Sequence, residues 1–152
     1  MVGEETLSQT RIRAWLATVV WTMAGVGFFL AFFSGGGAAE FDTDSGRHLW
    51  AAGAIGFGFV AYWSGLWLTR GRGNQIMTDE RDFQVVARAS QATLIVVLIA
   101  VFSLSVALWT IHEAEGVVAV GWMWFMAYGS MLVGLITNAV TVLILDGRTV
   151  GS

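Results

Sequence analysis

The chain has 152 residues, of which 56% are hydrophobic and only 12% are charged, and its mean hydropathy is +0.68. Soluble domains carry about 25% charged residues, so this composition is typical of a membrane protein. The net charge of −3 gives no reason to expect a nucleic-acid partner, and the absence of cysteine excludes disulfides and thiolate chemistry. The length predicts a single domain over residues 1–152.

Four apolar runs are long enough to cross the hydrocarbon core of a bilayer. A core of about 30 Å needs about 20 apolar residues at the helical rise of about 1.5 Å. Helices are favoured because the runs are continuous, whereas the strands of a membrane barrel alternate in segments of about ten residues. The runs lie near residues 14–33, 48–68, 93–111 and 117–145. The sequence therefore predicts an all-α integral membrane four-helix bundle made of two helical hairpins.

The basic residues, which are all arginine, are unevenly distributed along the predicted spans. Only Arg47 falls in a loop on one side, and the other arginines fall on the opposite side. The positive-inside rule places the arginine-rich side in the cytoplasm, and most tryptophans fall near span ends, as in aromatic belts. Trp21 and Trp63 lie deeper, and a belt does not explain them. We expect a multi-pass protein of the plasma (inner) membrane with both termini cytoplasmic.

Each predicted span carries a face of small or hydroxyl residues. In lipid, helices associate through close contact and interhelical hydrogen bonds, so such faces mark the side that packs against protein. We expect packing there, with a glycine-lined groove for a lipid, quinone, pigment or solute as the alternative. The faces are Ala14, Thr18, Thr22 and Gly25; Ala54, Gly58, Ala61 and Gly65; Thr93, Ala100, Ser103, Ala107 and Thr110; and Ala127, Ser130, Gly134, Asn138 and Thr141.

Asn138 is the carboxamide side chain inside a predicted span. An amide without a hydrogen-bond partner is costly in hydrocarbon, so we expect Asn138 to hydrogen-bond to another polar side chain in the bundle. The available partners are Thr22, Ser103 and Thr137.

A polar segment over residues 70–90 separates the two predicted hairpins. Thr78 or Asp79 can cap the helix that follows, and acids in its first turn are favoured by the helix dipole. The segment contains the run Asp79-Glu80-Arg81-Asp82, with Arg88 further along. These charges predict a surface ion-pair cluster at a helix start, and docking to a partner's cytoplasmic surface is the alternative.

This run, followed by Ala87-Arg88-Ala89-Ser90 and two further spans, resembles an uncharacterised family of small predicted four-helix membrane proteins. Members of that family carry an acidic-arginine motif before the third span. The resemblance covers about the C-terminal half of the chain. It implies the four-span architecture and singles out the motif, but it implies no activity, substrate or cofactor.

The two histidines, His48 and His112, fall at the outer ends of neighbouring spans, close to acidic loop residues. Neutral imidazole binds metals and titrates near physiological pH, so a metal or pH-sensing site is one interpretation. Neither an i, i+4 histidine pair nor an HExxH run is present. We therefore predict that these histidines are polar anchors at the membrane interface.

No catalytic motif emerges from the sequence. We expect a non-catalytic accessory or interaction protein without a cofactor, surrounded by membrane lipids and assembling with itself or with a larger membrane complex. A small-solute transporter or channel subunit with a polar path near Asn138 is the alternative. Coupled transport usually needs an ionisable group within the membrane, and the predicted spans place none well inside.

Overall fold

The protein was analysed as a computed structural model that describes residues 9–70 and 80–149, with side chains described for residues 10–69 and 83–147. The described chain is all-α, as predicted. Its elements are α1 (Gln9–Phe33), α2 (Ala38–Thr43), α3 (Ser45–Arg70), α4 (Glu80–His112) and α5 (Gly121–Thr149).

Four of these helices are long and apolar enough to cross a membrane. At about 1.5 Å per residue, the shortest of them, α1 with 25 residues, exceeds a hydrocarbon core of about 30 Å. The sequence has no proline, so no backbone donor is missing along any of them. The fourth span begins at Gly121 rather than at the predicted residue 117, because residues 117–119 have no regular secondary structure and Val120 lies in a turn before the helix.

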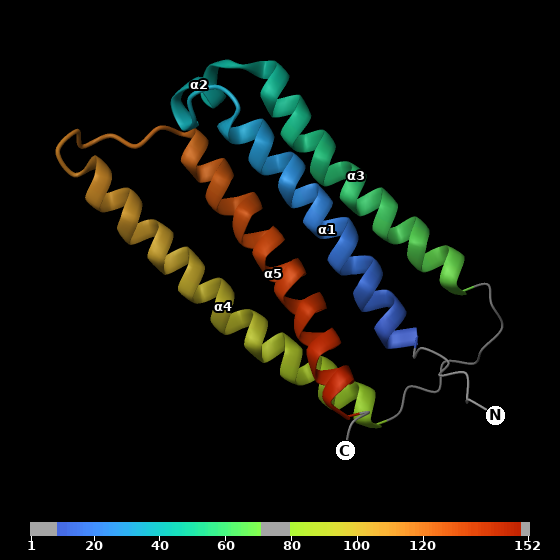
Figure 1. Ribbon diagram of the computed structural model, residues 1–152. Coiled ribbons are helices and arrows are strands. Elements are labelled where there is room, and N and C mark those ends of the chain that lie inside the picture. Colours follow the sequence, from blue (N-terminus) through green and yellow to red (C-terminus); the bar gives the residue numbers. More distant parts are fainter. Residues whose placement is uncertain (1–8, 71–79, 150–152) are drawn as a thin grey trace, which may run out of the picture.

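The long helices pack as two pairs (Figure 1), and we call the row of four helices the layer; it is not flat, because His48 of α3 also stacks on Trp124 of α5. Helix α1 packs against α3, α4 packs against α5, and α1 and α5 join the pairs. The order across the layer is therefore α3–α1–α5–α4, with α1 and α5 in the centre. Helices α3 and α4, which follow each other in the chain, lie at opposite edges.

This order accounts for the contrast between the most and the least covered helix. In their most apolar stretches, 28% of the residues of α1 are buried, 17% of those of α3 and of α5, and 6% of those of α4. A central helix has neighbours on both sides, whereas an edge helix has one. Both edges of the layer therefore present long apolar surfaces that only lipid or another protein can cover.

The buried face of α1 agrees only in part with the predicted face. Ala14 is buried and an added Cβ on Gly25 would lie 3.7 Å from Ile136 of α5, but Thr22 is exposed and several buried positions carry larger side chains. The reason is that α1 meets α5 as well as α3, and bulky residues fill the space between α1 and α5. The buried residues of α1 include Ala17, Trp21, Ala24, Phe28 and Phe32.

The predicted face of α4 is also largely wrong. Ser103, Ala107 and Thr110 are exposed. Thr93, the first residue of the predicted face, does lie against α5: a Cβ on Gly134 would be 3.8 Å from its side chain and 3.3 Å from that of Val97. Because α4 is an edge helix, its face with Ser103, Ala107 and Thr110 has no protein neighbour within the described chain.

The short helix α2, which the sequence did not predict, closes one end of the layer (Figure 1). Phe41 of α2 is fully buried, and its ring lies 5.0 Å from that of Phe32. The chain reaches α2 through Gly36 and Gly37, which have φ values of 115° and 82°. Only glycine adopts such values without strain, so this turn depends on both residues. We call this end of the molecule the α2 end.

The opposite end contains the start of α1, the end of α3, the start of α4 and the end of α5 (Figure 1). Here a second apolar cluster joins α1, α4 and α5 through Ala14, Val85, Ala89 and Val142. The arginines of these helix termini also lie at this end, so we call it the arginine-rich end.

Candidate functional site

The helix pair α1–α3 is held by contacts between small residues. A Cβ placed on Gly27 would lie 3.2 Å from the Cβ of Ala54, and a Cβ on Gly58 would lie 3.0 Å from that of Ala24. At Gly65 an added Cβ would collide with the side chain of Leu16. Small residues let two helix backbones approach closely in lipid. The glycine and alanine positions that the sequence singled out on this span thus lie against α1.

Trp21 takes its place from the same contact. Its ring lies edge-on to Phe59 at 4.9 Å and against Tyr62 at 5.9 Å, and a Cβ on Gly58 would lie 3.0 Å from it. Only 2% of Trp21 is exposed. Packing against α3 therefore accounts for Trp21, which the sequence places too far inside its predicted span for an interfacial belt. It does not account for Trp63, which is exposed.

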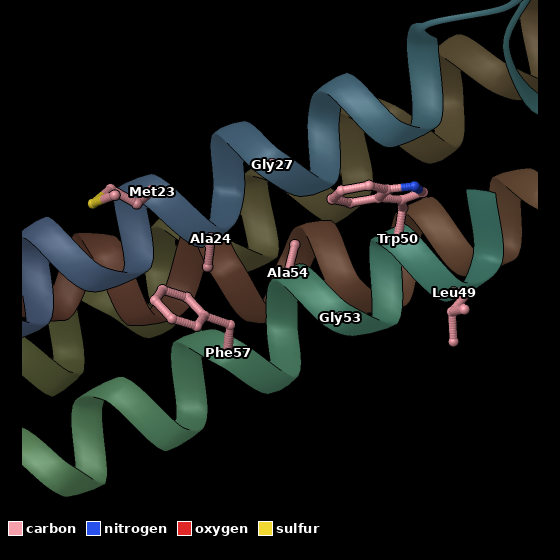
Figure 2. A pocket seen from close by; sticks show the side chains of 8 residues that line it. All are labelled: Met23, Ala24, Gly27, Leu49, Trp50, Gly53, Ala54 and Phe57. Carbon is pink, nitrogen blue, oxygen red and sulfur yellow. The ribbon is translucent and has the colours of Figure 1, made fainter. Parts of the chain in front are cut away.

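Beside this line of contact lies an apolar groove of about 550 Å³ between α1 and α3. Its floor is formed by small residues of both helices, and Gly53 has no atom within 4 Å of an added Cβ. Figure 2 shows the rings of Trp50 and Phe57 on α3 directed toward α1, with Ala54 between them. The lining residues are Met23, Ala24, Gly27, Leu49, Trp50, Gly53, Ala54 and Phe57.

The chemistry of this groove is almost entirely that of hydrocarbon. None of its lining side chains is charged, and the indole N–H of Trp50 is the polar group that a lining side chain contributes. Such a surface offers dispersion contacts and burial but no acid, base or metal ligand. Asn138 does not line it, so this groove is not the polar path considered for a transporter.

At the α2 end, the groove is followed by a polar cluster centred on Arg47. The Nε atom of Arg47 lies 3.2 Å from Oδ2 of Asp44, and Nη2 lies 3.4 Å from Oε2 of Glu40. The guanidinium rests directly on Gly35, where an added Cβ would collide with it. Asp44 also accepts the backbone N–H of Gly46 at 2.9 Å, which is the geometry of an N-cap for α3.

The two histidines lie on helices at opposite edges of the layer and form no common site. His48 packs between Phe41 at 4.6 Å and Trp124 at 5.9 Å, and its buried Nε2 has no hydrogen-bond partner among residues 9–70 and 80–149. Nδ1 of His112 lies 3.0 Å from the backbone oxygen of Leu108. In the part of the chain that the structure describes, no three His, Asp or Glu side chains gather in a way that could hold a metal ion.

Asn138 lies on the central helix α5, half-buried. Its buried Oδ1 has no hydrogen-bond partner among the described residues. Two of the predicted partners, Thr22 and Ser103, are exposed. The hydrogen bond expected for this oxygen is therefore not formed within the described chain, neither with these two exposed side chains nor with its half-buried neighbour Thr137.

The acidic-arginine motif lies at the start of α4. Asp79 falls outside the described residues, and Glu80, Arg81 and Asp82 belong to the first turn of α4, without described side chains. Arg88 is exposed on the third turn. On α5, Ser130 donates to the backbone oxygen of Ala127 at 3.0 Å, and Gly134 lies against α4.

Sequence reasoning missed two features. One is the pairing of Trp50 with Phe57 around Gly53; their spacing of seven residues, two helical turns, places both rings on one face and was a usable signal. The other is Asp146, which is only 7% exposed. It directly follows the predicted fourth span, so hydropathy gave no indication that it is buried.

The fold and the groove define the class of this molecule. It is an all-α multi-pass membrane protein with four candidate spans in two packed pairs. In comparisons with family models, curated proteins and solved structures, no match was found. The family resemblance inferred from the acidic-arginine motif therefore stays a prediction.

Proposed function

We propose that this protein is a non-catalytic component of the plasma membrane that assembles with a second copy of itself through α4. The observation that carries the proposal is the exposed face formed by Ser103, Ala107 and Thr110 on an edge helix. We call these three residues the α4 small face. In lipid, small and hydroxyl residues mark helix surfaces that pack against protein, and this face has no such neighbour in the described chain.

The spacing of the α4 small face suits self-association. Ser103 and Ala107 are four residues apart, which is the small-xxx-small pattern that lets two helices approach closely. In a twofold dimer, the same patch faces itself, so a patch of small residues is compatible with its own copy. The other edge of the layer differs, because α3 exposes the large side chains of Trp63 and Trp67 there.

Orientation in the membrane is part of the same proposal. The excess of arginine at one end supports a cytoplasmic position for that end and for both termini. The motif Asp79-Glu80-Arg81-Asp82 would then begin α4 on the cytoplasmic side, with the exposed Arg88 beside it. This arrangement supports a role for these charges in contacting a partner's cytoplasmic surface.

The experiment compares two phenylalanine substitutions on α4. Ala107→Phe places a large ring on the small face, whereas Ser105→Phe places the same ring two residues away, about 200° around the helix. Both positions are exposed. The masses of the two variants and of the wild type are measured by light scattering in mild detergent, after subtraction of detergent and lipid.

The expected result is a dimer for the wild type and for Ser105→Phe, and a monomer for Ala107→Phe. A wild-type protein that remains strictly monomeric, in detergent and in nanodiscs, contradicts self-assembly. Another outcome is a different protein that copurifies with the wild type and is absent from preparations of Ala107→Phe. That outcome would show that the partner of the α4 small face is that different protein and not a second copy of the chain. Solute flux through reconstituted vesicles that Asn138→Leu abolishes would favour the transporter alternative.

A further inference from the structure

We propose that the groove between α1 and α3 binds one acyl chain of a zwitterionic membrane phospholipid, with the headgroup at the α2 end. This inference concerns the edge of the layer opposite to α4, so it does not depend on the assembly proposed above. It rests on the position of the groove, the chemistry of its lining and the charges at its end.

The position of the groove selects a hydrocarbon occupant. Both helices that form it are candidate spans, and its lining residues on α3 run from Leu49 to Phe57 within the span Ser45–Thr69. At about 1.5 Å per residue, Gly53 lies about 12 Å from the start of α3 at Ser45. The groove therefore opens sideways into the half of the bilayer nearest the α2 end, where acyl chains are the surrounding solvent.

The shape of the groove suits a linear chain. Trp50 and Phe57 are seven residues apart, so their rings are separated by about 10 Å along the helix axis. Between them the floor is lowered by Gly53, whose missing side chain leaves open space, and by Gly27, which lies against Ala54. The volume of about 550 Å³ falls within the range of about 300–1,000 Å³ typical of ligand pockets.

The lining excludes a polar occupant. It provides no charged group and no side-chain acceptor, so a headgroup or ionic solute placed there would lose its hydration without compensation. An acyl chain has no polar group to satisfy. An acyl chain in the groove contacts two aromatic rings and two helices at once. An acyl chain that lies on a single helix without a groove makes fewer such contacts.

The charges at the α2 end select the headgroup. Arg47 precedes Trp50 by one turn, so its cluster with Glu40 and Asp44 lies at the end of the groove. This end also carries Asp42, Glu113 and Glu115, and acids outnumber the single arginine. Like charges repel, so a headgroup with net negative charge is disfavoured there relative to a zwitterionic one.

The test uses two glycines of α3 that both face open space. An added Cβ meets no atom within 4 Å at Gly53 or at Gly56, but only Gly53 lines the groove. Gly53→Leu therefore places a side chain in the groove from a position where its Cβ has open space, and Gly56→Leu is its matched control. Full-length proteins are placed in nanodiscs with equal amounts of phosphatidylcholine and phosphatidylglycerol, released, and examined by native mass spectrometry.

The expected result is one retained phosphatidylcholine per chain for the wild type and for Gly56→Leu. Its occupancy should fall at least fivefold in Gly53→Leu, while helicity and thermal midpoint remain those of Gly56→Leu. A phosphatidylcholine with a photoreactive acyl chain should label peptides containing Met23 or Trp50 in the wild type, and this labelling should be lost in Gly53→Leu.

Three results would overturn the proposal or part of it. Equal lipid retention by Gly53→Leu and Gly56→Leu would show that the groove binds no chain selectively. Crosslinks between two protein copies at Trp50 would show that a second copy occupies the groove. Retention of phosphatidylglycerol in place of phosphatidylcholine would overturn the assignment of the headgroup. The lipid measurements do not bear on the α4 small face, so their failure is distinguishable from failure of the proposed assembly.

Discussion

Single glycines of α3 have different roles that depend on which way each residue faces. Gly58 is buried, and an added Cβ would lie 3.0 Å from both Ala24 and the ring of Trp21. Gly56, two residues away, is exposed and has no atom within 4 Å of an added Cβ. A glycine-to-valine substitution costs helix propensity at both sites but causes overpacking only at Gly58. The difference between the two variants therefore measures the cost of overpacking.

We predict that Gly58→Val lowers the free energy of unfolding by about 1–3 kcal/mol, because the added methyl groups force α1 and α3 apart. Gly56→Val should change it by less than about 0.5 kcal/mol. Unfolding in mixed detergent micelles, followed by circular dichroism, measures both values. If the two variants were equally destabilised, close contact at Gly58 would not be the cause.

Asp44 combines a helix cap with an ion pair, and two substitutions separate them. Its Oδ1 accepts the backbone N–H of Gly46, and its Oδ2 pairs with Arg47. Asp44→Asn keeps the cap and should cost no more than about 1 kcal/mol, because the ion pair is partly exposed. Asp44→Ala removes both and should cost about 1 kcal/mol more than Asp44→Asn. Equal losses in the same unfolding assay would show that the cap contributes nothing.

Among the elements, α2 has an importance that its length does not suggest. It has only six residues, yet Phe41 is fully buried among Phe32, His48 and the start of α5. An added Cβ on Gly121 would lie 2.6 Å from the backbone oxygen of Ala38, so α5 starts in direct contact with α2. Through these contacts α2 ties α1, α3 and α5 together at one end.

We predict that Phe41→Ala destabilises the protein by about 3–5 kcal/mol, the usual cost of removing a buried aromatic ring. Thr43→Ala is the control on the same helix, because Thr43 is exposed and its hydroxyl bonds only to the backbone oxygen of Glu40. The thermal midpoint in mild detergent is the measurement. A Phe41→Ala variant as stable as Thr43→Ala would show that α2 only covers the end of the layer.

The elements also show where sequence reasoning succeeds and where it fails. Continuous apolar runs predicted the four long helices, because length and hydropathy alone decide whether a segment can span a bilayer. They did not predict α2, whose six residues lie in a polar loop. Its helix depends on the burial of Phe41, which is a tertiary contact.

The order of the helices across the layer was not predictable, and most errors in the predicted faces follow from that. On α3, which has one principal neighbour, the face with Gly58 and Gly65 lies against α1. Helix α1 has two neighbouring helices, and large residues such as Trp21 and Phe28 occupy its buried positions. The groove depends on the same order, since Gly53 lies in a groove only because α1, and not another helix, stands beside α3.

At the scale of the whole molecule, the distribution of arginine predicts how the protein sits in the membrane. The ends of the layer differ, with Arg47 alone at the α2 end and other arginines, including Arg11 and Arg88, toward the opposite end. The chain has no cysteine, so single cysteines report position without background. Gln84→Cys and Gly147→Cys place one at the arginine-rich end, and Glu115→Cys places one at the α2 end; all three positions are exposed.

We predict that a membrane-impermeant maleimide added to intact cells labels Glu115→Cys and leaves Gln84→Cys and Gly147→Cys unlabelled, since positive residues are retained on the cytoplasmic side. After permeabilisation all three should react, which shows that each thiol is accessible. Labelling of Gln84→Cys in intact cells, with Glu115→Cys protected, would invert the orientation. The acyl-chain groove would then belong to the cytoplasmic leaflet and the acidic-arginine motif would face outward, away from any cytoplasmic partner.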